Sequence, residues 1–120
     1  MKLLDSFAWM EYFMGSKRGT KIRDYVDGNE TLYLPSVCLT EIRSRYLREK
    51  KDPVSRINLI IERSLIIPLD QEIALLAADI RQKHKLHTID AIIYATSLLK
   101  GLTLVTGEEQ CKALPNDELS

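Results

Sequence analysis

Four short apolar runs alternate with longer stretches of helical spacing, and this alternation restricts the fold more than any other feature of the chain. The runs cover residues 2–5, 31–34, 64–68 and 102–106. Near-continuous apolar strands that alternate with helices are typical of a parallel sheet with helices on both faces. We therefore expect an α/β fold in which right-handed crossovers connect parallel strands.

Helical periodicity fills the segments between the apolar runs. We expect helices to begin near residues 7, 17, 36, 53, 70 and 88, at or just after residues that favour a helix start. The segment 88–100 is apolar almost all round, which predicts a helix buried against the sheet. After residue 106 we expect one helical turn, a turn at Pro115 and Asn116, and an edge strand at 118–119. The length predicts a single domain over residues 1–120.

Composition excludes several classes of protein. The longest uninterrupted apolar run, 73–78, is six residues, whereas a membrane-spanning helix needs about 20. Only two apolar residues separate Lys2 from Asp5, so we identify no signal-peptide core and expect a cytoplasmic protein. Cys38 and Cys111 have no partners at zinc-site spacing, and we expect both to be reduced thiols.

The chain has 17 basic and 17 acidic side chains, so its formal net charge is zero. This balance argues against a protein that binds nucleic acid through a uniformly basic surface. The basic residues nevertheless gather in two segments, which form either solvated helix faces or the rims of a cleft that contacts phosphates. The first segment is 17–23, with Lys17, Arg18, Lys21 and Arg23 and no acid. The second is 41–56, with Arg43, Arg45, Arg48, Lys50, Lys51 and Arg56 against Glu41, Glu49 and Asp52.

Carboxylates follow the predicted strands. Asp5 ends the first strand, Glu41 lies about one and a half turns into the helix after the second, and Glu108 follows the fourth. Asp90 lies in the first turn of the buried helix, and it points the same way if that helix runs antiparallel to the strands. Binding sites in parallel α/β folds lie beyond the carboxyl ends of the strands. We therefore expect the four acids to meet at one edge of the sheet.

Each acid also has a purely structural interpretation. Asp5 could cap a helix, Glu41 could pair with Arg45 four residues on, and Asp90 and Glu108 could complement helix dipoles. Taken together, however, converging carboxylates repel one another and favour a bound cation, and hard oxygen ligands suit Mg²⁺ or Mn²⁺. Such an ion can activate water and stabilise charge on a phosphodiester.

The chain contains no competing catalytic motif. None of the patterns GxxxxGK[ST], GxGxxG and GxSxG occurs. His84 and His87 form an HxxH spacing near a predicted helix end, and we interpret them as capping or exposed groups because no partner ligand is evident.

Five segments, in order, resemble the PIN-domain ribonucleases, and in particular the VapC toxins of toxin–antitoxin pairs. They are LDSFAW at 4–9, LPS at 34–36 leading to LTEI at 39–42, AADIR at 77–81, TIDAIIYAT at 88–96 and LVTGE at 104–108. The resemblance implies a three-layer α/β/α sandwich with a central parallel sheet of four to five strands. It also implies a carboxylate cluster that binds Mg²⁺ or Mn²⁺, and cleavage of single-stranded RNA by metal-activated water.

Carried over position by position, the resemblance makes four acids both catalytic and metal-binding: Asp5, Glu41, Asp90 and Glu108. The first three match the family pattern as they stand. The fourth departs from it, since the family usually has aspartate at this position, a second acid two positions later and an aromatic after that. Here those slots hold Glu108, Gln110 and Cys111, with Glu109 as an alternative fourth acid, so one metal ion is favoured over two. Ser6 and Thr106 match the supporting hydroxyls, and both also have structural interpretations.

The resemblance also implies partners. They are RNA, a cognate VapB-like antitoxin that places a basic side chain in the acidic cleft, and a second copy of the chain in a homodimer, with no membrane. Trp9, Tyr12 and Phe13 form either core packing or a dimer or antitoxin surface. Two other functions stay open: a PIN nuclease for RNA processing without an antitoxin, and a catalytically silent RNA- or protein-binding module.

Overall fold

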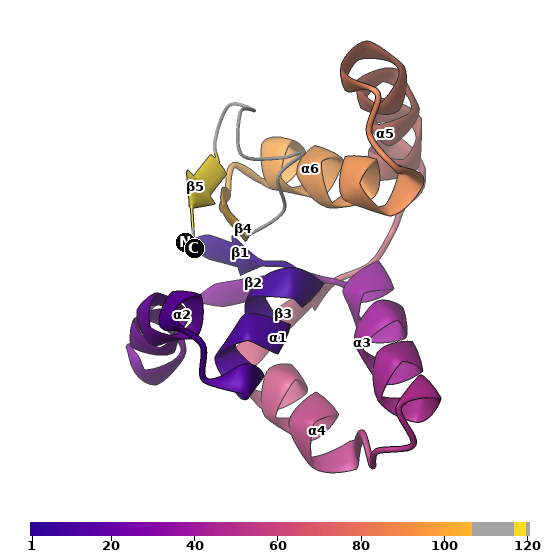
Figure 1. Cartoon of the computed structure of the whole chain (residues 1–120). Helices are drawn as coiled ribbons and strands as arrows, with labels where there is room; N and C mark the ends of the chain where they lie inside the picture. Colours follow the sequence, from indigo (N-terminus) through magenta and orange to yellow (C-terminus); the bar gives the residue numbers. More distant parts are fainter. Residues whose placement is uncertain (107–116, 120) are drawn as a thin grey trace.

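The computed structural model describes residues 1–106 and the strand at 117–119, and its centre is a five-stranded parallel sheet (Figure 1). The strand order is β3-β2-β1-β4-β5, and every pairing is parallel. The strands are β1 (Lys2–Leu4), β2 (Leu32–Pro35), β3 (Ser64–Ile67), β4 (Thr103–Thr106) and β5 (Asp117–Leu119). The predicted α/β class and the parallel sheet of four to five strands are confirmed.

Helices cover both faces of this sheet, which completes the expected α/β/α sandwich. They are α1 (Ser6–Met14), α2 (Lys17–Asp27), α3 (Ser36–Arg48), α4 (Val54–Arg63), α5 (Gln71–His84) and α6 (Thr88–Lys100). Figure 1 shows α1 to α4 on one side of the strands and α6 on the other, with α5 beside one end of α6. No helix within residues 1–106 combines the length and the apolar character that a bilayer crossing requires.

The strand order explains why the helices divide in this way. From β1 to β2 and on to β3 the chain steps toward one edge, and from β3 to β4 it steps back across the sheet. Right-handed crossovers in opposite directions place their helices on opposite faces. The first two crossovers contain α1 to α4, whereas the third contains α5 and α6.

The core lies where α6 crosses the central strands. Residues 91–97 of α6 are all buried, as the nearly uniform apolar sequence predicts. In β1 and β4, Leu3, Leu4, Leu104 and Val105 are fully buried. Both faces of these strands are therefore covered, which accounts for their continuous apolar runs.

The chain connections bring three helix starts to the carboxyl edge of the sheet. The first turns of α1 and α3 come directly after β1 and β2. α6 ends at Gly101, whose positive φ of 64° closes the helix, and β4 begins two residues later. The last turn of α6 thus lies at the amino ends of the strands and its first turn at their carboxyl ends. Because α6 runs antiparallel to the strands, Asp90 in its first turn lies at the carboxyl edge of the sheet.

The helix α2 is held in place by close packing at Gly19 and by hydrogen bonds from Arg63, and we call these two contacts the α2 anchor. Gly19 packs so closely on α1 that a Cβ atom there would collide with the carbonyl oxygen of Glu11. At the other end, the Arg63 guanidinium donates hydrogen bonds of 2.6–3.0 Å to four carbonyl oxygens, at residues 25, 26, 28 and 30. Arg63 thereby satisfies carbonyl groups that the end of α2 and the following turn would otherwise leave without partners.

Candidate functional site

Asp5 lies between β1 and α1, and its side chain is 3% exposed. One carboxylate oxygen, Oδ1, accepts a hydrogen bond of 2.8 Å from the Ala8 backbone N–H. Asp5 is therefore the N-cap of α1, so the structural interpretation of this residue is correct. The cap also fixes the carboxylate at the sheet edge, which is what a functional role requires.

Glu41 approaches the same place from α3. Its Oε1 accepts a hydrogen bond of 2.7 Å from the hydroxyl group of Ser6, which is the first residue of α1. The alternative pairing with Arg45 is wrong, because the Arg45 guanidinium contacts Glu49 instead, with Nε 3.2 Å from Oε2. Burial raises the pKa of Glu41, the charge of Asp90 raises it further, and the Ser6 hydrogen bond acts in the opposite direction.

Asp90 lies half-buried in the first turn of α6, on the other face of the sheet. Burial raises its pKa, and the nearby His87 opposes this effect. His87 is exposed at the start of α6 and makes no side-chain cap, so the prediction of an exposed group is confirmed. His84 is half-buried and lies edge-on to Tyr94, with ring centroids 6.4 Å apart.

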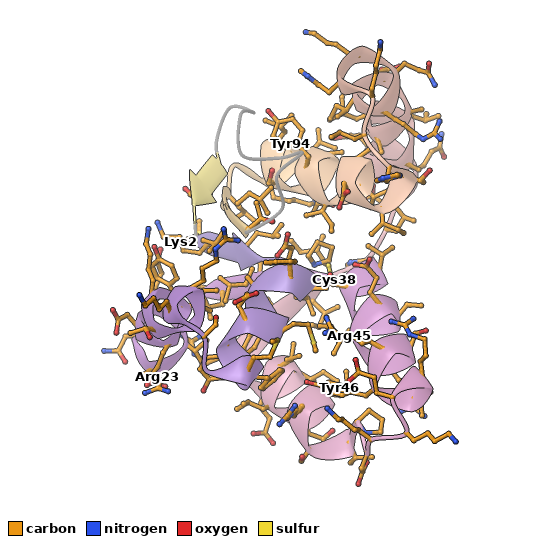
Figure 2. All side chains as sticks on the ribbon, in the orientation of Figure 1. Lys2, Arg23, Cys38, Arg45, Tyr46 and Tyr94 are labelled. Atoms are coloured by element: carbon orange, nitrogen blue, oxygen red, sulfur yellow. The ribbon has the colours of Figure 1, made fainter. Side chains whose placement is uncertain are left out.

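A buried thiol lies close to two of these carboxylates, Asp5 and Glu41. Cys38 is fully buried in α3, and Figure 2 shows it between that helix and α6. Burial raises its pKa well above the usual range, and the charges of Asp5 and Glu41 raise it further. Both carboxylates must therefore lie within electrostatic reach of one sulfur. Nothing in the sequence alone assigns Cys38 to a site, although its i, i+3 spacing to Glu41 puts the two on one helix face.

Three of the four predicted acids thus gather at one edge of the sheet, and we call Asp5, Glu41 and Asp90 the acidic edge. Thr106 is fully buried at the end of β4, the strand next to β1. Glu108 and its neighbours Glu109, Gln110 and Cys111 lie outside the described residues. Their roles stay predictions.

The chemistry of the acidic edge fits a hard cation. Glu41 and Asp90 form no salt bridge with any lysine or arginine in the described part of the chain. Buried carboxylates that lack protein cations are stabilised by a bound divalent ion, and oxygen ligands suit Mg²⁺ or Mn²⁺. Within 1–106 and 117–119, however, no three His, Cys, Asp or Glu side chains are arranged to hold a metal ion. Completion of such a site therefore requires further ligands or a rearrangement of these ones.

A groove of about 360 Å³ opens beside Glu41, between α1 and α3. We call it the α1–α3 groove. Its lining residues are Ser6, Phe7 and Met10 from α1 and Glu41, Ser44, Arg45 and Arg48 from α3. It therefore extends from a hydrogen-bonded carboxylate to two arginines.

The aromatic cluster of α1 belongs to the core. Trp9 is fully buried, and its ring centroid lies 5.7 Å from those of Tyr12 and Phe13. Tyr12 and Phe13 are half-buried and pack on the core. The Arg56 guanidinium lies over Phe13, 5.1 Å from its ring centroid. Core packing, the first of the two interpretations of this cluster, accounts for these contacts.

Solved structures with the same fold include several toxin–antitoxin proteins. A toxin–antitoxin complex from Klebsiella pneumoniae has a TM-score of 0.81 at 22% identity, over 98% of this chain and 96% of that one. VapBC2 from Rickettsia felis, bound to a promoter DNA fragment, has a TM-score of 0.77 at 18% identity, over 99% of this chain and 96% of that one. VapC20 from Mycobacterium tuberculosis, a sarcin–ricin loop cleaving toxin, has a TM-score of 0.72 at 16% identity, over 89% of this chain and 88% of that one. At these identities the likeness shows the fold.

Sequence comparison assigns the family. No curated protein sequence matches the chain. The family model for the PIN domain matches residues 2–116, which is nearly the whole chain. The match spans strands β1 to β4 and all three residues of the acidic edge. This chain belongs to the PIN domain family.

Proposed function

We propose that this chain is a metal-dependent endoribonuclease that hydrolyses phosphodiester bonds in single-stranded RNA, and that it is the toxin of a toxin–antitoxin pair. One observation carries the proposal. Carboxylates from three separate elements gather at the carboxyl edge of the sheet, where Asp90 acts on Glu41 and both Asp5 and Glu41 act on Cys38. Neither Glu41 nor Asp90 forms a salt bridge with a lysine or arginine in the described residues. PIN domains are in general divalent-metal-dependent nucleases, which fits this arrangement.

In this proposal Asp5, Glu41, Asp90 and Glu108 hold Mg²⁺ or Mn²⁺. When bound, the ion supplies positive charge that offsets the carboxylate repulsion and the charge that develops on the phosphodiester. Ser6 orients Glu41 through its 2.7 Å hydrogen bond. Thr106, buried at the end of the neighbouring strand, supports the site from below.

The structural neighbours support a proposal about partners. The neighbours include a toxin–antitoxin complex and VapBC2 bound to promoter DNA. We therefore propose a cognate VapB-like antitoxin and a homodimer for this chain, with residues 1–120 acting as one PIN domain. A small DNA-binding protein encoded next to this chain would support the toxin, and its absence would favour an RNA-processing nuclease.

A catalytically silent binding module is the second candidate. One observation favours it: the described residues do not include a complete group of metal ligands. Isothermal titration calorimetry distinguishes the two, since a silent module would bind RNA without binding Mn²⁺.

Cleavage of an unstructured RNA tests the proposal. We expect cleavage by the parent protein in Mn²⁺ or Mg²⁺, none in EDTA, and at least a hundredfold loss in Asp5→Asn. Asparagine is as good an N-cap as aspartate, so this change leaves α1 capped. Arg23→Ala is the control, because this exposed arginine lies on α2 (Figure 2) and does not line the α1–α3 groove. Equal cleavage by Asp5→Asn, or cleavage that persists in EDTA, would overturn the assignment.

A further inference from the structure

The α1–α3 groove has a distinct character at each end. Its α3 wall is one helical stripe, since Glu41, Ser44, Arg45 and Arg48 follow the i, i+3, i+4, i+7 spacing of a single face. The seven residue steps from Glu41 to Arg48 correspond to about 10 Å along the helix axis. The groove thus connects the acidic edge to a cationic end two turns away.

Arg48 is the more available of the two arginines. Arg45 is half-buried, and its guanidinium is engaged by Glu49, which also lies 3.4 Å from Lys51 Nζ. Arg48 is exposed and has no ion pair or hydrogen bond with any residue in 1–106. An unpaired arginine in a groove can bind an anion, and its planar guanidinium matches a phosphate.

The opposite wall presents an aromatic ring. Phe7 lines the groove half-buried, and it is not among the half-buried side chains that pack on the core. It also makes no ring contact with a described aromatic side chain, unlike Tyr12 and Phe13. A partly exposed aromatic beside a cationic groove is the arrangement with which proteins bind unpaired bases.

We propose that the α1–α3 groove holds the single strand of RNA that leads away from the acidic edge, with Arg48 on a phosphate and Phe7 stacked on a base. This inference rests on the proposed function and adds the substrate path to it. Charge complementarity favours this occupant, since the groove combines an aromatic face with an arginine that has no ion pair among residues 1–106. An acidic peptide could pair with Arg48 alone, but it would not use the ring of Phe7.

The test measures binding of a fluorescent, unstructured 12-nucleotide RNA to Asp5→Asn protein, in which we expect cleavage to be at least a hundredfold slower. We expect Arg48→Ala to weaken binding about fivefold at 0.1 M salt. One phosphate contact on a single strand contributes a slope of about 0.7 in log affinity against log salt, which is about fivefold in affinity at 0.1 M relative to 1 M salt. Phe7→Leu keeps an apolar side chain and should weaken binding at least about fivefold. Arg23→Ala removes the same charge elsewhere and should change binding less than about twofold.

Two further probes separate the contacts. Arg48→Lys should restore most of the affinity, since it restores the charge. With an abasic oligonucleotide of the same length, Arg48→Ala should still weaken binding, whereas Phe7→Leu should not. If Arg48→Ala and Phe7→Leu both behave like Arg23→Ala, the groove is not the RNA path. If Arg48→Ala weakens binding of a 12-residue polyglutamate but not of RNA, the groove binds an acidic protein segment and the inference is wrong.

Parallel cleavage assays separate this inference from the proposed function. If the parent protein cleaves RNA with Mn²⁺ while the groove variants bind like the control, only the path is wrong. If the parent protein neither binds nor cleaves RNA, the proposed function is wrong and the path with it.

Discussion

The two basic segments of the chain look alike in sequence but occupy different places in the fold. Residues 17–23 lie on α2, which is anchored to α1 and leads to the amino end of β2. Residues 41–48 lie on α3, which starts at the carboxyl end of β2 and passes the acidic edge. In Figure 2, Arg23 and Arg45 lie on opposite sides of the helical layer. Position relative to the strand ends, and not the local count of charges, therefore assigns a basic segment to the site.

This difference predicts separate consequences of mutation. Changes in and around α2 should affect folding stability, whereas changes at the acidic edge and in the groove should affect metal, RNA and cleavage. The following experiments test whether stability and activity separate in this way, and they are given in decreasing order of expected effect.

The largest effect should follow from removal of the α2 anchor. Arg63→Met keeps the side-chain volume but leaves four carbonyl groups without their charged donor. We expect the free energy of unfolding to fall by about 3 kcal/mol, at the upper end for hydrogen bonds to a charged group. Urea denaturation measures this change, with Arg23→Ala, expected within about 0.5 kcal/mol of the parent, as the control. A loss of cleavage per folded molecule without a loss of stability would break the division.

Glu41→Gln should have the opposite profile. The substitution removes a half-buried charge next to Asp90, so the folded protein without metal should be no less stable than the parent. Cleavage should fall at least about a hundredfold, or roughly 2.7 kcal/mol, because a proposed metal ligand is lost. Steady-state cleavage and a thermal melt, measured on the same preparation, check both halves. Destabilisation in proportion to the lost activity would show that Glu41 is structural.

Ser6→Ala should have a smaller effect, which depends on Glu41. Without the 2.7 Å hydrogen bond the carboxylate loses its orientation, and we expect cleavage to fall about tenfold. Ser6→Thr should retain most of the activity. In a double-mutant cycle, Ser6→Ala should add almost nothing to Glu41→Gln, since the two side chains act as a unit. Additive effects would mean that Ser6 acts independently of Glu41.

The smallest of these effects should be a gain in the stability of the metal-free protein, and it should follow from Asp90→Asn. The half-buried Asp90 charge lies near that of Glu41, so a neutral side chain of the same shape relieves repulsion in the metal-free protein. We expect the melting temperature in EDTA to rise by a few degrees, which corresponds to about 1 kcal/mol. Addition of Mn²⁺ should raise the melting temperature of the parent but not of Asp90→Asn. A lower melting temperature in EDTA would show that the Asp90 carboxylate stabilises the fold.

Much of the fold was predictable because the strands are buried on both faces. Continuous apolar runs such as the one that contains Leu104 mark such strands without help from distant residues. The buried helix α6 was equally clear from its sequence. Asp5 and Glu41 could be placed at one edge because that edge follows from the topology rule alone.

The contacts within the site could not be predicted in the same way. The Ser6–Glu41 hydrogen bond joins residues 35 positions apart, and it depends on how α1 and α3 pack. The sequence permits the local i, i+4 pairing of Glu41 with Arg45 equally well, but Glu49 binds that arginine from the other side. The burial of Cys38 beneath the carboxylates likewise depends on α6, which comes fifty residues later in the chain.

Isothermal titration calorimetry of Mn²⁺ tests the central claim most directly, because it examines the acidic edge without assuming a substrate. We expect saturable binding of Mn²⁺ to the parent and to Arg23→Ala. We expect at least tenfold weaker binding to Asp5→Asn and Asp90→Asn, which alter two different elements of the same edge. Binding of equal strength to all four proteins, or no binding to the parent, would contradict this claim.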